Sequence, residues 1–116
     1  MTNANEVLTG FTGTENWYKY PLNGCTYTDG VQHLAASFGA YWLIDLVFSH
    51  QFEKKVRQQS FQVWELKKSA GSAFNIIATD GNGNPIARQH IPFSDFPFDA
   101  VTIWLCEGCL MLPTEY

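Results

Sequence analysis

The spacing of apolar residues changes near residue 60, and this change constrains the fold more than any other feature. Before it, the segment "YTDGVQHLAASFG" has apolar residues at i, i+3, i+4 and i+7, on one face of a helix: Val31, Leu34, Ala35 and Phe38. Thr28 or Asp29 can accept hydrogen bonds from the first turn, and Gly39 suits the left-handed residue that ends many helices. The segment is therefore predicted to form an amphipathic helix.

The next segment, "AYWLIDLVFSHQ", is apolar on nearly all sides, so its periodicity fits two structures. As a helix it carries one polar stripe, formed by Tyr41, Asp45 and Ser49. As a strand it would place bulky apolar residues at alternate positions on one face, and its β-branched and aromatic residues favour that structure. Its length favours a buried helix, and we predict a second helix here.

After residue 60 the chain consists of short β-forming segments separated by turn residues. "FQVWELK" is rich in β formers, and "SAFNIIATD" and "PIARQHIPF" flank the turn sequence "DGNGN", which predicts a hairpin. "VTIWLC" and "CLMLP" flank Glu107 and Gly108, which predicts a second hairpin with a two-residue turn, and we expect Trp104 to pack into the core.

These segments together predict an α+β fold. Near the N-terminus, "WYKYP" predicts a short edge strand that ends at Pro21. With 116 residues the chain has room for one domain, residues 1–116. We expect two N-terminal helices packed on an antiparallel β-meander of about four to five strands.

Two cysteines three residues apart, Cys106 and Cys109, suggest a metal or redox site, but their context favours a structural role. A structural zinc site needs four ligands, whereas the one further thiol is Cys25 and the three histidines follow no recognisable spacing. A thioredoxin-like pair would begin a helix, which is not the context here. The two cysteines are therefore predicted to face each other across the hairpin.

The turn "DGNGN" resembles the start of a calcium-binding loop. Such a loop requires a bidentate Glu at its twelfth position, and counting from Asp80 that position is Ile91. We therefore predict that the protein has no metal site and no cofactor.

Asp45 is the most unusual single residue, because a carboxylate within an apolar element must be paired, hydrogen-bonded or protonated. A hydrogen-bonded structural role is the simpler interpretation. The chain has no nucleophile motif such as G-x-S-x-G and no phosphate-binding glycine loop. We predict that the protein is not an enzyme, and the alternative is a small enzyme that uses Asp45 or a cysteine.

Aromatic and charged residues indicate a surface for another protein. Aromatic residues make up 16% of the chain, which exceeds the usual needs of a small core, and five of the seven basic residues lie between Lys54 and Lys68. The candidate partner-binding residues are Trp17, Tyr18, Lys54, Lys55, Arg57 and Trp64. We expect a stoichiometric protein-binding module, and a homodimer is the alternative occupant of the same surface.

Nucleic acid and membranes are less favoured partners. Basic residues and aromatics alternate in the segment from Lys54 to Lys68, as in single-strand binders, but the pI of about 5.1 argues against nucleic acid. The longest apolar run, Ala40 to Phe48, contains Asp45 and is too short to span a bilayer. The N-terminus lacks the pattern of a secretory signal, and the odd number of cysteines suggests free thiols, so we expect a cytoplasmic protein.

Several segments taken together resemble a family of short uncharacterised proteins of bacteria, phages and plasmids. They are "FTGTENWYKY", "YTDGVQHLAASFGAYWLIDLVFSHQ", "FQVWELK", "DGNGNPIARQHIPFSDFP" and "LMLPTEY", which span nearly the whole chain. The resemblance implies no catalytic residues. A phage or mobile-element setting implies a modulator or inhibitor of host machinery, such as an anti-CRISPR-like inhibitor of a defence system.

Overall fold

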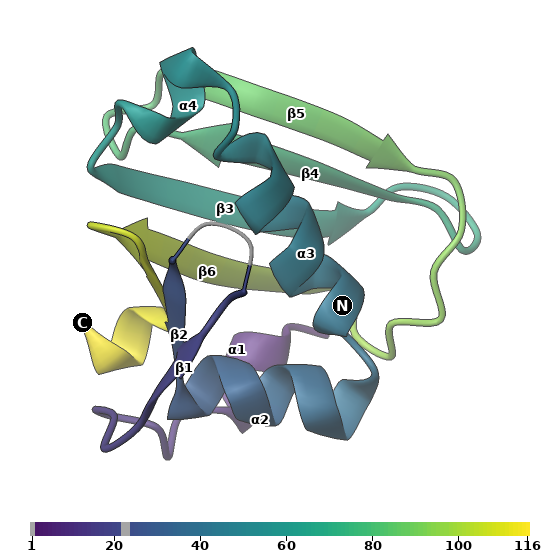
Figure 1. Ribbon diagram of the computed structural model, residues 1–116. Helices are drawn as coiled ribbons and strands as arrows, with labels where there is room; N and C mark the ends of the chain where they lie inside the picture. The colour runs from purple at the N-terminus through teal and green to yellow at the C-terminus, as the bar shows by residue number, and fades with distance from the viewer. Residues whose placement is uncertain (1, 22–23) are drawn as a thin grey trace.

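The computed structural model describes residues 2–21 and 24–116, which form a mixed β-sheet with the helices α2 and α3 on one face (Figure 1). The elements in chain order are α1 (Ala4–Val7), β1 (Trp17–Lys19), β2 (Thr26–Thr28), α2 (Asp29–Phe38), α3 (Tyr41–His50), α4 (Lys54–Arg57), β3 (Phe61–Lys68), β4 (Phe74–Thr79), β5 (Pro85–Ile91), β6 (Ala100–Cys106), β7 (Cys109–Met111) and the 3₁₀ helix η1 (Pro113–Glu115). The strand order is β1-β2-β7-β6-β3-β4-β5. The β2–β7 pair is parallel, and the other pairs are antiparallel.

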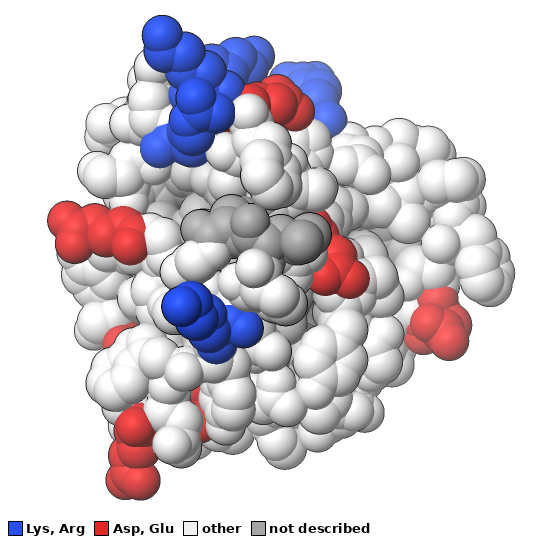
Figure 2. All heavy atoms as spheres, in the orientation of Figure 1, with Lys and Arg blue, Asp and Glu red and all other residues white. Residues whose placement is uncertain are grey.

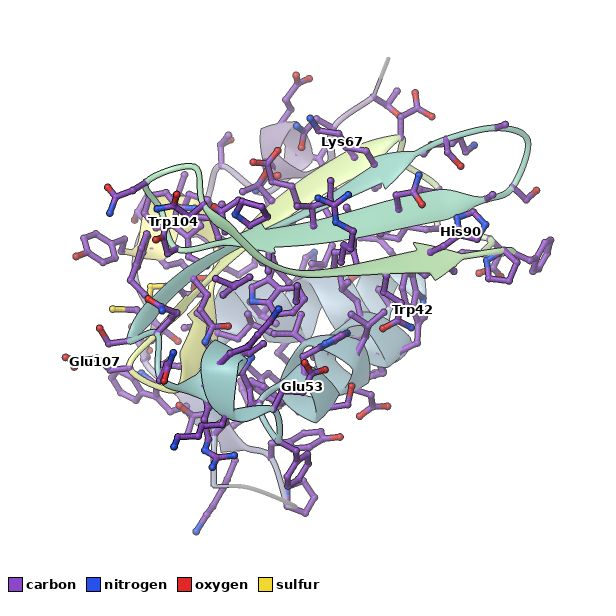
Figure 3. The ribbon with its side chains drawn as sticks, turned by 90° about the horizontal axis from the view of Figure 1, so that it is seen from above. Trp42, Glu53, Lys67, His90, Trp104 and Glu107 are labelled. Carbon is purple, nitrogen blue, oxygen red and sulfur yellow. The ribbon has the colours of Figure 1, made fainter. Side chains whose placement is uncertain are left out.

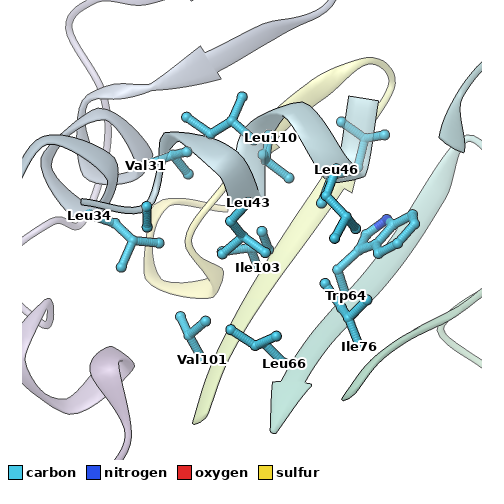
Figure 4. Close-up of a cluster of buried hydrophobic side chains, with 14 of the residues drawn as sticks. Val31, Leu34, Leu43, Leu46, Trp64, Leu66, Ile76, Val101, Ile103 and Leu110 are labelled. Atoms are coloured by element: carbon cyan, nitrogen blue, oxygen red, sulfur yellow. The ribbon is translucent and has the colours of Figure 1, made fainter. Parts of the chain in front are cut away.

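The hydrophobic core lies between the sheet and helices α2 and α3 (Figure 4). Burial alternates along β3 and β6, because successive residues of a strand point to opposite faces of the sheet. The inward side chains of these strands thus face the helices: Trp64, Leu66 and Ile103. On the helix side of the core lie Leu34 of α2 and Leu43 of α3. The helices α2 and α3 do not cover the opposite face of the sheet. Figure 3 shows this uncovered face, which carries Lys67 and Trp104.

The α+β class is confirmed, but the predicted arrangement of two N-terminal helices on a meander of four to five antiparallel strands is wrong. Among the described residues, the sheet has seven strands and is mixed, and α2 and α3 lie in mid-chain after β1 and β2. Two further short helices, α1 and α4, were not predicted. The elements α1, β2 and α4 have three or four residues each, too few to show a hydrophobic period, so the sequence pattern does not reveal them.

The two predicted long helices are confirmed. Thr28 caps α2, since its hydroxyl accepts a hydrogen bond from the N–H of Val31, and Gly39 ends the helix with φ of 63°. The segment from Tyr41 to His50 forms α3, the buried helix. Asp45 lies on the exposed side of α3, where the hydroxyl of Tyr20 donates to it at 2.8 Å.

The C-terminal hairpin is confirmed, whereas the predicted core position of Trp104 is wrong. Glu107 and Gly108 have φ of 49° and 81°, as a two-residue type I′ turn requires. Cys106 and Cys109 lie opposite each other in the register of β6 and β7, as predicted. Trp104 occupies an outward position of β6 and packs partly exposed against Phe61 and Tyr116, because the alternation of β6 turns Ile103 and Leu105 inward.

The C-terminus is anchored to the N-terminal end of α2 by one carboxylate. Glu115 accepts hydrogen bonds from the Thr28 hydroxyl at 2.6 Å, from the Gly30 N–H at 3.0 Å and from the Leu112 N–H at 2.9 Å. A carboxylate at this place stabilises the helix, because the first N–H groups of a helix have no partner within it. A Cβ on Gly30 would lie 2.5 Å from Glu115 Oε1 and 2.6 Å from Leu112 Cδ1.

We expect Gly30→Ala to lower the free energy of unfolding by about 1–3 kcal/mol, because the added methyl displaces this carboxylate or Leu112. Chemical denaturation measures the change. Gly13→Ala is the matched control, since a Cβ there meets no atom within 4 Å. Equal stability of the two variants would contradict a tight contact between η1 and α2.

Candidate functional site

A groove of about 610 Å³ runs between helix α3 and strand β5. We call it the α3–β5 groove, and its lining residues are Trp42, Asp45, Leu46, Ser49, Gln89, Ile91, Phe93, Ser94 and Asp95. Four of these side chains are large and apolar, and the others are polar or acidic. Pockets that combine apolar walls with a few polar groups are the usual form of a binding site.

The helix side of the groove lies at the boundary between the buried and exposed faces of α3. Leu43, Val47 and Phe48 are fully buried against the sheet. Trp42 and Asp45 lie about one helical turn apart at the boundary of that buried face, so both reach the groove. Figure 3 shows Trp42 on the helix-covered side of the sheet, near β5.

The strand side arises because β5 is the last strand of the sheet and is only partly covered by α3. Ile91 pairs with Phe74 of β4 and lines the groove. The loop after β5 is held in place by the buried ring of Phe96 and by the N–H of Ser94, which donates to the carbonyl of Ser72 at 2.9 Å. Phe93, immediately before Ser94 in this loop, remains 72% exposed. An aromatic ring of this exposure beside a groove is a typical contact residue.

The groove is acidic. Asp45 and Asp95 both line it, and no Lys, Arg or His is among the lining residues. Tyr20 donates its hydroxyl to Asp45, and this hydrogen bond raises the pKa of Tyr20. Within residues 2–21 and 24–116, neither aspartate forms an ion pair.

The charge changes sign along β5. His50 of α3 lies 2.8 Å from Gln89 of β5, measured between Nε2 and Oε1, and this contact marks one end of the groove. Beyond it a smaller hollow is lined by Lys55 and Arg88, together with Glu53. Figure 2 shows Lys and Arg side chains gathered over α4 at the top of the molecule. The edge of the sheet near α4 is therefore basic, and the groove is acidic.

The structure separates the predicted partner-binding residues into different regions. Trp17 is 61% exposed and Tyr18 half-buried on β1, at one end of the sheet. Lys54, Lys55 and Arg57 are exposed on α4, which contacts β5 at the other end. Trp64 is fully buried, so its prediction as a contact residue is corrected: it occupies an inward position of β3.

Tyr18 has a structural contact that the sequence did not indicate. Its hydroxyl donates to Asp29 at 3.0 Å. The backbone N–H of Glu15, the hydroxyl of Tyr18 and the amide of Asn16 stabilise the carboxylate of Asp29 and lower its pKa to about 2. Asp29 thus ties the loop before β1 to the start of α2.

The turn "DGNGN" and the cysteines, for which the sequence predicts no metal site, have the surroundings of structural residues. The carboxylate of Asp80 accepts hydrogen bonds within its own turn, from the N–H of Asn82 at 2.8 Å and the side chain of Asn84 at 2.9 Å. In the described part of the chain, no group of three or more His, Cys, Asp or Glu residues could hold a metal ion. Burial raises the pKa of the Cys25 and Cys109 thiols, which lowers the population of reactive thiolate.

The sequence did not indicate the α3–β5 groove, although Asp45 was a candidate for other reasons. The signal closest to it is "IPFSDFP", in which prolines bracket two phenylalanines. One of them, Phe96, is buried and the other, Phe93, is exposed. A loop sequence has no period that would separate the two, so only the tertiary structure identifies Phe93 as a surface residue.

Among known proteins, no curated protein and no solved structure matches the chain. None of the helices among residues 2–21 and 24–116 combines the length and apolar character that a membrane crossing needs. A family model matches residues 2–116, in agreement with the resemblance seen in the sequence motifs. The chain therefore belongs to DUF6876, a family of unknown function.

Proposed function

We propose that this protein binds a segment of another protein in the α3–β5 groove and acts by that contact, without catalysis. The observation that supports the proposal most is the groove itself: it combines large apolar side chains, an exposed Phe93 and the edge of the sheet. Aromatic side chains supply large contact area at small entropic cost, which is why they are enriched in protein interfaces.

The position of β5 suggests how such a segment would bind. β5 is the end strand next to β4, and on its other side it has no strand partner among the described residues. An extended segment laid along this edge would gain backbone hydrogen bonds from β5 and place alternate side chains in the groove. Binding by strand addition requires no rearrangement of the sheet.

The enzyme alternative receives no support from the geometry. Asp45 accepts a hydrogen bond from Tyr20, and the hydroxyl of Ser49 donates to the carbonyl of Leu46 at 2.7 Å. These contacts engage both polar groups in local structure, and neither forms the nucleophile–base pair that covalent catalysis needs. We therefore keep binding as the proposed activity.

The nucleic-acid alternative is also weakened. The two aromatic residues of the segment from Lys54 to Lys68, Phe61 and Trp64, do not share a surface with the basic residues of α4. Trp64 is buried, and Phe61 lies on the opposite face of the sheet, against Trp104 and Tyr116. Stacking and phosphate contacts need to lie along one track.

Selection from a library of random short peptides, with the purified protein as bait, tests the proposal. We expect selected peptides whose affinity falls about tenfold or more in Phe93→Ala, because this side chain contributes exposed aromatic area at the groove. Phe52→Ala is the matched control, since Phe52 is 60% exposed and does not line the groove. Fluorescence anisotropy with labelled peptides measures both changes.

Peptides that bind equally well to Phe93→Ala, or that lose affinity only in Phe52→Ala, would contradict the proposed site. Recovery of no peptide by the folded protein would contradict the proposed activity. The phage or mobile-element setting, the inhibition of host machinery such as a defence system and the cytoplasmic location remain predictions.

A further inference from the structure

We propose that the partner segment carries a lysine or arginine whose cationic group is held between Asp45 and Asp95 in the α3–β5 groove. This inference rests on the proposed function and specifies the chemistry of the partner. It requires a segment with apolar side chains for the walls of the groove and at least one basic side chain for its carboxylates.

The first support is charge complementarity. The groove holds two carboxylates and no cationic side chain. The other acidic groups near cations are already paired: Glu53 with His50, Glu65 with Lys67, and Asp99 with Lys68. Asp45 and Asp95, like several other acids among the described residues, form no ion pair with a cation of the chain. They are distinguished by lining the same groove, where a partner's cation can reach both carboxylates. Complementary charge across an interface fixes register and partner choice.

The second support is the shape of a basic side chain. Lysine and arginine have apolar stems that pack on hydrophobic surface while the charged end reaches polar groups. Leu46 and Ile91 provide apolar surface in the same groove as the carboxylates, and Trp42 adds an aromatic ring. A cation beside an aromatic face gains further electrostatic attraction. The groove thus offers a place for both parts of one basic side chain.

The charge pattern along β5 also restricts where this residue lies in the segment. The acidic groove is next to the end of β5 at Ile91, whereas Lys55 and Arg88 line the hollow near its start. A basic side chain of the partner is attracted to the acidic groove and repelled by the basic hollow. The segment is therefore expected to be basic at one end only.

A second copy of the chain is a weaker occupant than another protein. The residues from Phe52 to Arg57 have basic and aromatic side chains on the surface, which match the groove chemically. However, they form the short helix α4 and its preceding turn. A strand-like fit along β5 would require this segment to unfold, which would expose the buried Val56.

The test repeats the peptide selection with wild type and with Asp45→Asn/Asp95→Asn as baits. We expect peptides that depend on Phe93 to be enriched in Lys or Arg at one position with wild type, and to lose this enrichment with the double variant. Asn keeps an acceptor for the Tyr20 hydroxyl, so the local structure is retained. Glu107→Gln is the control, because Glu107 is an exposed acid of the β6–β7 turn.

A selected peptide and its counterpart with that Lys or Arg changed to Gln then complete a double-mutant cycle. We expect about a tenfold preference of wild type for the basic peptide, weaker at high salt, and no preference in the double variant. Circular dichroism confirms that each variant is folded.

The outcomes separate the two proposals. Peptides that bind in a Phe93-dependent way without enrichment of Lys or Arg would overturn this inference and leave the proposed function intact. Selection of no Phe93-dependent peptide would overturn both. Sedimentation that shows a dimer disrupted by Lys54→Glu and by Asp95→Asn would place a second copy in the groove and overturn the assignment to another protein.

Discussion

Trp64→Ala is expected to lower the free energy of unfolding by about 3–5 kcal/mol. Trp64 is the largest fully buried side chain among the described residues, and it lies between β3 and α3, near Leu46 and Ile76 (Figure 4). Its indole N–H donates to the side-chain oxygen of Gln62 at 2.9 Å. Truncation removes this apolar area from the core, leaves a cavity and deprives Gln62 of a hydrogen bond.

Trp104→Ala provides the comparison, with an expected loss of about 1–2 kcal/mol. The same side chain is removed there, but from the outward face of β6, where it packs partly exposed against Phe61 and Tyr116. Urea denaturation of both variants measures the difference. Equal losses in the two variants would contradict the assignment of Trp64 to the inner face and Trp104 to the outer face.

Gln62→Leu is expected to lower the free energy of unfolding by about 3 kcal/mol, although the new side chain is apolar and the site is buried. The side-chain amides of Gln62 and Gln51 form two mutual hydrogen bonds of 2.9 Å. Gln62 also donates to the carbonyl of Val56 at 2.9 Å and accepts from the indole of Trp64. Leucine leaves the Trp64 N–H and the Gln51 side-chain oxygen buried without these partners.

Gln58→Leu is the matched control, because Gln58 is exposed at the end of α4 and the same substitution there is expected to change stability by less than about 0.5 kcal/mol. Adding Gln51→Leu to Gln62→Leu is expected to cost less than the sum of the two single changes, since the second change removes groups that the first left unsatisfied. Strict additivity would show that the two amides stabilise the fold independently of each other.

The residue pattern of β3 explains why the sequence did not separate a buried tryptophan, Trp64, from a surface tryptophan, Trp104. In "FQVWELK" both faces of β3 carry apolar residues, since Phe61 and Val63 alternate with Trp64 and Leu66. The polar Gln62 lies on the buried face, where hydrogen bonds to Gln51 satisfy it. An alternation of polar and apolar residues identifies the buried face only when polar residues stay outside, and here they do not.

Local interactions were sufficient for several predictions from the sequence. The start and end of α2 depend on Thr28 and Gly39, and the β6–β7 turn depends on Glu107 and Gly108. In each case the determining contacts lie within a few residues of one another, so capping and turn preferences predict them directly. The helix α3 followed from its length and apolar character, which few other structures accommodate.

The sequence by itself therefore determined the α+β class, the two long helices and the hairpins, because neighbouring residues encode them. Only the tertiary structure decided that β6 pairs with β3, that β2 lies parallel to β7 and that β5 is the end strand. Pairing between distant strands depends on how the whole core packs, and no short segment contains that information. The α3–β5 groove, with Asp45 and Asp95 brought together from residues fifty positions apart, exists only as a consequence of that packing.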